Sequence, residues 1–157
     1  MYVRFESPTA NRHGTRLGVF VLMNGLAHEG RLSPTQHQQW RTTNDWFNAA
    51  YPNPSHLDPT IYDRAINPGA VAWFKEEATH LMDRVPAYLA ILASHGVACV
   101  RRTTTDPGRI VYEDESQVIA IPHQEPPMRD EVLELRQLRQ SATSTRPVVR
   151  QSDRGGD

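Results

Sequence analysis

The chain has 157 residues, of which 38% are hydrophobic, and its 17 basic and 18 acidic side chains give a formal net charge of -1. This length suits one domain, and the balanced charge excludes a global field that would draw the protein onto nucleic acid or an anionic membrane. Cys99 is the only cysteine, which excludes an internal disulfide and a cysteine-based zinc site within one chain. Without a secretory signal or a membrane-length apolar run, we expect a cytoplasmic protein.

The first elements in chain order are a strand and two helices. Tyr2–Glu6 alternates apolar and polar residues as a strand does, and residues 17–29 are apolar at helical spacing. Ser33, Pro34 and Gln36 then form a capping box that starts a helix reaching about residue 50. Two helices joined by so short a loop predict an αα-hairpin.

Four prolines interrupt residues 51–69, which we expect to be a long surface loop. Residues 70–94 are apolar at helical spacing and predict a third helix, which Pro86 should kink or split and Gly96 should end.

The last elements are strands, because the period changes to two in residues 97–104, 109–114 and 117–122. A tight turn over Asp106-Pro107-Gly108 joins the first two of them. The predicted order is β-α-α-α-β-β-β. We therefore expect an α+β fold with an antiparallel sheet of about four strands, in which the last three form a meander and the helices pack on one face.

The domain boundary follows from composition, since residues 124–157 contain no aromatic side chain. We expect a single α+β domain over residues 1–123, a Pro-led amphipathic helix over residues 124–140 and a disordered tail over residues 141–157.

One side of the predicted third helix combines apolar and polar side chains. It is either covered by the chain's own helices or left as a surface for a protein partner, with Trp73 as the anchor. Its members at helical spacing include Trp73, Glu77, His80, Arg84 and Ile91.

Signatures of the common enzyme classes are missing from the sequence, among them GxGxxG, GxxxxGK[ST], HExxH and GxSxG. Glu77 and His80 are candidates for acid–base catalysis by a small enzyme. Glu76 and His80 stand one helical turn apart, but two ligands are too few for a metal site. We therefore expect no cofactor and no metal, and an enzyme is the less favoured interpretation.

The predicted hairpin around residue 107 is strongly charged. Its register would place Arg101 opposite Asp114 and Arg102 opposite Glu113, so that cross-strand ion pairs fix the pairing. Alternatively, Arg101, Arg102 and Arg109 form a basic ridge on which Tyr112 stacks a nucleic-acid base.

Several motifs resemble those of a family of small bacterial proteins with the pattern WFK…H…HG…PGxVVYEDxxQVVA. This chain has Trp73-Phe74-Lys75, His80, His95-Gly96, residues 107–114 reading PGRIVYED, and residues 117–120 reading QVIA. With residues 2–5 and 46–48 the similarity extends over residues 1–122. The family is known to us only as uncharacterised, so the resemblance implies no activity, and Pro86 departs from its pattern.

These patterns favour a non-catalytic, protein-binding accessory or regulatory module, either with a protein partner or through self-association. The alternatives are a nucleic-acid-binding protein that uses the hairpin and the arginine-bearing tail, and a small enzyme that uses Glu77 and His80.

Overall fold

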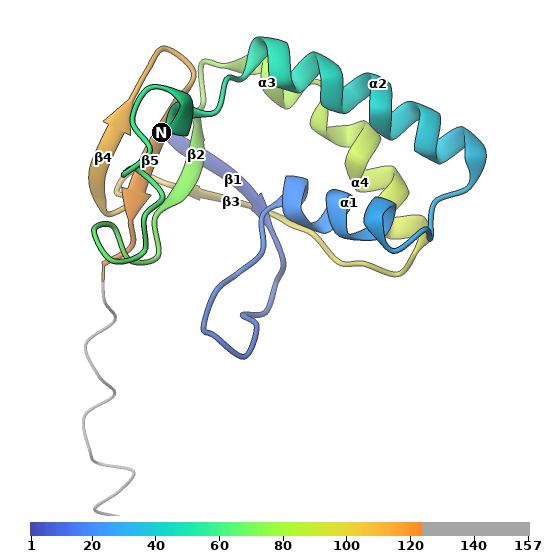
Figure 1. Cartoon of the computed structure of the whole chain (residues 1–157), viewed down its shortest axis with the longest axis horizontal. Coiled ribbons are helices and arrows are strands. Elements are labelled where there is room, and N and C mark those ends of the chain that lie inside the picture. The colour runs from blue at the N-terminus through green and yellow to red at the C-terminus, as the bar shows by residue number, and fades with distance from the viewer. Residues whose placement is uncertain (124–157) are drawn as a thin grey trace, which may run out of the picture. The chain divides into compact units, whose positions relative to one another are not determined.

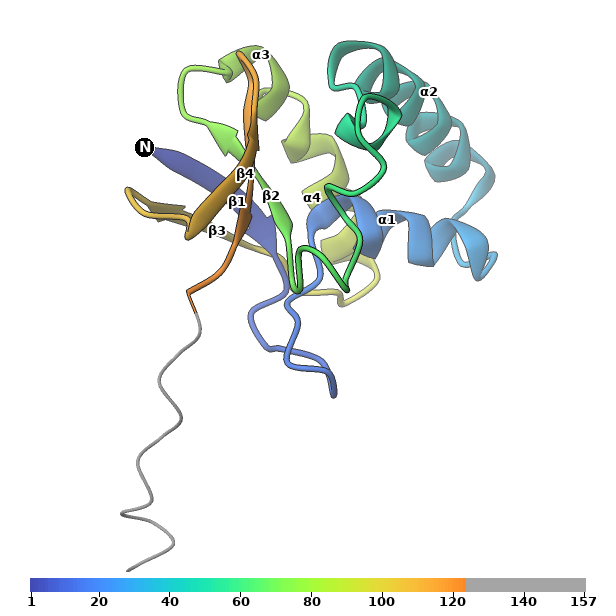
Figure 2. The same ribbon diagram turned by 60° about the vertical axis from the view of Figure 1, so that its left-hand side comes forward.

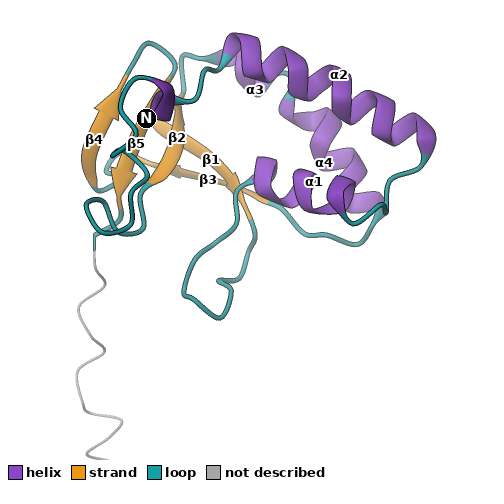
Figure 3. Ribbon diagram, viewed as in Figure 1, coloured by secondary structure: helices purple, strands orange, loops and turns teal. Residues whose placement is uncertain are grey.

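The computed structural model describes residues 1–123, and the helix expected over residues 124–140 and the tail over 141–157 lie outside the described residues. Strands gather on one side of the domain and helices on the other (Figures 1 and 3). The elements follow the chain as β1 (Tyr2–Glu6), α1 (Val19–His28), α2 (Pro34–Ala50), the 3-10 turn η1 (Pro54–His56), β2 (Val71–Lys75), α3 (Thr79–Met82), α4 (Val85–Ser94), β3 (Val100–Thr104), β4 (Arg109–Glu113) and β5 (Gln117–Ile121).

The five strands form one sheet in the order β3-β1-β2-β5-β4, and every neighbouring pair is antiparallel. The expected α+β fold, with helices against one side of an antiparallel sheet, is confirmed. The sheet has one strand more than the four expected, because part of the stretch predicted as the third helix is β2.

The helix expected over residues 70–94 is wrong in its first half. Val71–Lys75 is a strand between β1 and β5, and its Val, Trp and Phe are residue types that favour strands. In so short a run, apolar residues match helical and strand spacing equally well. The expected interruption at Pro86 is confirmed, since this proline lies in the first turn of α4, where its missing N–H costs no helical hydrogen bond.

The expected three-stranded meander is also wrong. β3 pairs with β1 and β4 pairs with β5, so β3 and β4 form opposite edges of the sheet. Residues 105–108 nevertheless join them. Four strand spacings amount to about 19 Å in a flat sheet, whereas five residue steps reach at most about 18 Å. The sheet must therefore curl, and its two ends are strongly turned relative to each other in Figure 2.

The two N-terminal helices form as the sequence predicts. Both hydrogen bonds of the expected capping box are present. The Ser33 hydroxyl accepts from the backbone N–H of Gln36, and the side-chain oxygen of Gln36 accepts from the backbone N–H of Ser33. Trp40 ties α2 to α1 by donating from Nε1 to the Asn24 side chain at 3.0 Å. The αα-hairpin is thus anchored at its start and along its length.

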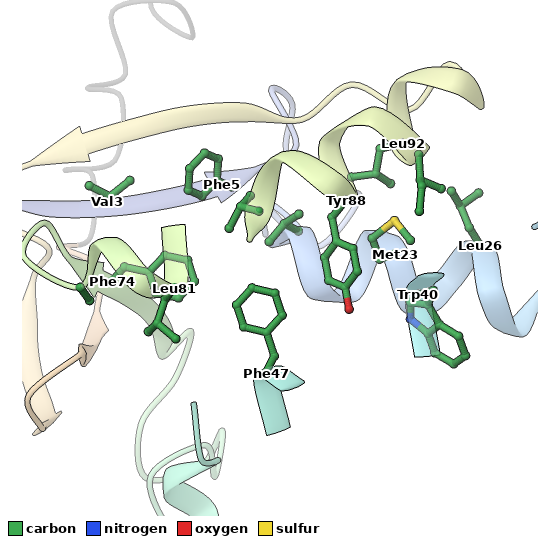
Figure 4. Packing of buried hydrophobic residues seen from close by; sticks show 14 residues of the cluster. Val3, Phe5, Met23, Leu26, Trp40, Phe47, Phe74, Leu81, Tyr88 and Leu92 are labelled. Carbon is green, nitrogen blue, oxygen red and sulfur yellow. The ribbon is translucent and has the colours of Figure 1, made fainter. Parts of the chain in front are cut away.

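Aromatic side chains fill the space between helices and sheet. Tyr88 of α4 is fully buried and lies among Phe47 of α2 and Met23 of α1, while Val3, Phe5 and Phe74 close the sheet side (Figure 4). The Phe20 ring is centred 4.9 Å from that of Phe47 in an edge-on arrangement. In residues 1–123, no helix combines the length and the apolar character that a membrane crossing requires.

Candidate functional site

The predicted binding side around Trp73 does not exist as one surface. Trp73 lies on β2, and Glu77 lies just after that strand. His80 lies on α3, Arg84 precedes α4 and Ile91 lies within α4. The Trp73 side chain is half-buried with its Nε1 enclosed, and Ile91 is part of the core. Arg84 lies over a different tryptophan, with its guanidinium carbon 4.7 Å from the centre of the Trp46 ring. The predicted helix side that joined these residues to Trp73 is therefore wrong, because it depended on one continuous helix.

Glu77 and His80 are both exposed. Glu77 lines an open depression together with Lys75, Thr105 and Glu115, and such a surface does not shield an acid–base pair from water. Among the described residues, no three His, Cys, Asp or Glu side chains gather closely enough to hold a metal ion.

The predicted charged hairpin is likewise divided. Arg101 and Arg102 lie on the β3 edge, whereas Arg109 and Tyr112 lie on the β4 edge. The predicted ion pairs are wrong because β3 and β4 are not paired with each other in the sheet.

The charged side chains find other partners in the folded sheet. Glu113 pairs with Lys75 at 2.6 Å instead, and Tyr112 donates from its hydroxyl to Asp114 at 3.0 Å. Arg101 and Arg102 are therefore not cross-strand neighbours of Tyr112.

A compact charge cluster centres on Glu6, the last residue of β1, and we call it the Glu6 cluster: Glu6, Arg4, Arg16 and Arg102. Its carboxylate lies 2.6 Å from Arg4 Nε, 3.3 Å from Arg102 Nη1 and 3.9 Å from Arg16 Nε. Arg4 and Arg102 stand directly opposite each other on β1 and β3, where two like charges repel. The buried carboxylate between them offsets that repulsion, and the cluster keeps three positive charges against one negative charge.

The free edge of the sheet next to this cluster is β3. Within residues 1–123, β3 pairs only with β1, and its first four residues are exposed. An apolar groove, here the β3 groove, begins where α4 ends and leads to the start of the strand. Its lining includes Leu89, Ala93, Val97, Cys99 and Val100.

Cys99 lines this groove and is half-buried, and burial raises the pKa of its thiol. A raised pKa keeps the sulfur protonated and unreactive at neutral pH, as expected for a cysteine with a packing role.

Sequence reasoning found Arg101 and Arg102 but missed Arg4, Glu6 and Arg16. A signal for two of them was present: alternate residues of a strand share a face, so Arg4 and Glu6 of the predicted strand had to be neighbours. The position of Arg16 in a loop carries no such signal.

Comparisons with known proteins returned nothing: no family model, no curated protein and no solved structure matches this chain. The resemblance to the small bacterial family therefore stays a prediction.

Proposed function

We propose that this protein is a non-catalytic protein-binding module that takes an extended, acidic segment of a partner protein along the free edge of β3. The observation that carries the proposal is the juxtaposition of that edge with the β3 groove and the arginines of the Glu6 cluster.

The edge supplies the backbone part of such an interaction. An added strand takes its affinity from main-chain hydrogen bonds and its specificity from places for alternate side chains. β3 offers five residues for pairing, and the groove at Val100 offers a place for one apolar side chain of the incoming segment.

Charge selects the kind of segment. Arg101 and Arg102 are exposed on β3, and Arg102 belongs to a cluster with an excess of positive charge. An acidic segment would place its carboxylates opposite these guanidinium groups, which are suited to paired hydrogen bonds with carboxylates.

The same arginines disfavour a second copy of the chain at this edge. If two β3 strands paired antiparallel about Arg102, the arginines of both copies would face one another, and like charges directly opposite destabilise a strand pair. The partner at this edge is therefore an acidic segment of another protein and not a second copy of the chain.

Fluorescence anisotropy tests the proposal with the full chain and a labelled synthetic peptide in which Glu and Val alternate. We expect saturable binding that weakens with salt. Arg101→Glu should weaken it about tenfold or more, since reversing one charge at a contact costs on the order of 1.4 kcal/mol. Arg109→Glu, which makes the same charge change on the opposite edge, should leave binding unchanged.

A second probe separates strand addition from simple charge attraction. Methylating alternate backbone amides of the peptide keeps its carboxylates and removes the hydrogen bonds that a new strand needs. Equal binding of the methylated peptide, or equal loss in both arginine variants, would overturn the proposal. Tighter binding of a single-stranded oligonucleotide than of the peptide would favour the nucleic-acid alternative instead.

A further inference from the structure

The β1–β2 ladder opens after two residue pairs, Tyr2 with Lys75 and Val3 with Phe74. Where the strands part, the guanidinium of Arg4 fills the gap. Its Nη1 donates to the Ala72 carbonyl at 2.8 Å and its Nη2 to the Arg16 carbonyl at 3.2 Å. With Nε bound to Glu6 and only 11% of the side chain exposed, this arginine is held rigidly inside the domain.

A recess adjoins this guanidinium, and we call it the Arg4 recess. Its volume is about 40 Å³, which leaves room for a few water molecules or one group of a few heavy atoms but not for a nucleotide. Phe20 and Phe74 supply apolar walls, and Gly18 leaves one wall open because it has no side chain. The lining includes Arg4, Gly18, Phe20, Tyr51, Ala72 and Phe74.

The polar groups around the recess are donors. A guanidinium has five N–H donors, of which Arg4 uses three in the bonds above, so two remain. Burial raises the pKa of the Tyr51 phenol, which keeps it protonated and able to donate. Burial likewise raises the pKa of Tyr62 to about 12, and this phenol lies within electrostatic range of Arg4 and Tyr51.

The charges near the recess are positive in sum. Glu6 is shared among Arg4, Arg16 and Arg102, so one negative charge faces three positive charges. Asp114 is the acidic group that opposes this on the side of Tyr51. Its carboxylate is occupied by hydrogen bonds from Tyr112, Ser116 and Gln117, which leaves it little capacity to take the remaining donors.

We propose that the Arg4 recess binds a small oxyanion, a phosphate or carboxylate group, between the Arg4 guanidinium and the Tyr51 hydroxyl. The start of α1 at Gly18 and Val19 borders the same recess, and no side chain caps that helix. The positive end of the α1 dipole therefore lies at the recess and favours a negative charge there. The recess is a different surface from the β3 edge and does not depend on peptide binding there.

Isothermal titration calorimetry of the full chain tests this site, with inorganic phosphate and acetate as probes and sodium chloride at matched ionic strength as the reference. We expect saturable binding of phosphate, acetate or both, and the stronger response identifies the preferred oxyanion. Tyr51→Phe keeps the ring and removes one donor to a charged group, so the affinity should fall about tenfold.

Two glycine variants control for folding, because Arg4→Gln would also break the Glu6 cluster. Gly18 has an ordinary extended backbone, and a Cβ there would lie 3.4 Å from Arg4 Nη2. Gly18→Val should therefore narrow the recess and abolish binding in a folded protein. Gly25→Val adds the same side chain to α1 where nothing lies within 4 Å, and it should bind as the parent does. The proposal would be overturned if the unmutated chain released no more heat with phosphate or acetate than with sodium chloride. It would also be overturned if Gly18→Val bound the oxyanion as tightly as the unmutated chain.

Discussion

At the scale of single residues, the buried hydroxyl of Tyr88 lowers the stability of the core. The side chain is fully buried, and its oxygen has no hydrogen-bond partner among the described residues. A buried hydroxyl without a partner loses its hydration and regains nothing. The surrounding rings, including Phe20 and Phe47 at 6.2 and 5.8 Å between centroids, still benefit from the aromatic ring itself.

Tyr88→Phe should therefore raise the free energy of unfolding, by about 1 kcal/mol. Urea unfolding followed by tryptophan fluorescence measures this change. Tyr112→Phe is the matched control, since it removes a hydroxyl that does donate, to Asp114 at 3.0 Å, and it should lower stability. A loss of stability in Tyr88→Phe would mean that this hydroxyl has a partner in solution.

At the scale of elements, the turn between β4 and β5 is built on Asp114. One carboxylate oxygen accepts from the backbone amides of Ser116 and Gln117 at 2.8 and 2.9 Å, and the other accepts from the side chains of Tyr112 and Gln117. Burial by itself raises the pKa of Asp114, but these hydrogen bonds to the charged form outweigh it and hold the pKa below its usual range.

This lowered pKa gives the turn a predictable pH dependence. Because the carboxyl is more acidic in the folded chain, its contribution is complete above the ordinary aspartate value of about 4 and is lost as the pH falls through the folded pKa. Asp114→Asn should cost about 2 kcal/mol at neutral pH, and the deficit should shrink below about pH 4. Urea unfolding at several pH values measures it.

Glu115→Gln is the control, because it removes a carboxylate from the same turn but from an exposed residue. It should have little effect at any pH. A stability difference between Asp114→Asn and the parent chain that stays constant from neutral to acid pH would contradict this account.

Local chemistry made some elements predictable and left others ambiguous. The Ser33–Gln36 capping box and the left-handed Gly96 after α4, with φ of +68°, can be recognised from residue types alone. Val71–Lys75 could not, because five apolar-rich residues satisfy either period, and only pairing with β1 and β5 decides. The strand predicted over residues 117–122 is β5, and its Val118, Ile119 and Ala120 are all fully buried, as suits an interior strand.

At the scale of the whole domain, strand order was beyond the sequence. Residues 106–108 have the composition of a hairpin turn, but β3 finds its partner in β1 and β4 in β5. Which strands pair depends on which faces become buried when segments distant in the sequence meet, and no local sequence pattern indicates this. The Glu6 cluster was missed for a similar reason. Arg102 approaches Glu6 only once β1 lies beside β3, and Arg16 approaches it only once the chain after β1 folds back to the Glu6–Gly18 bridge.

The short link between the two sheet edges depends on Gly108. Its φ of +110° is rarely adopted by other residues, and a Cβ there would collide with the carbonyl oxygen of Ile121. Gly108→Ala should therefore combine backbone strain with a clash against β5, and we expect it to cost at least about 2 kcal/mol. Gly14→Ala separates the two effects, because Gly14 also has a positive φ, +73°, but nothing lies within 4 Å of its added Cβ.

The Gly14 variant should lose about 1 kcal/mol, from strain alone. Thermal unfolding compares the two variants, and hydrogen exchange locates the damage. If the link holds the curled sheet closed, amides of β4 and β5 should exchange faster in Gly108→Ala while those of α1 and α2 change little. Equal stability of the two variants would show that residues 105–108 do not pack tightly against β5. The curl of the sheet would then have to come from the strand pairing alone.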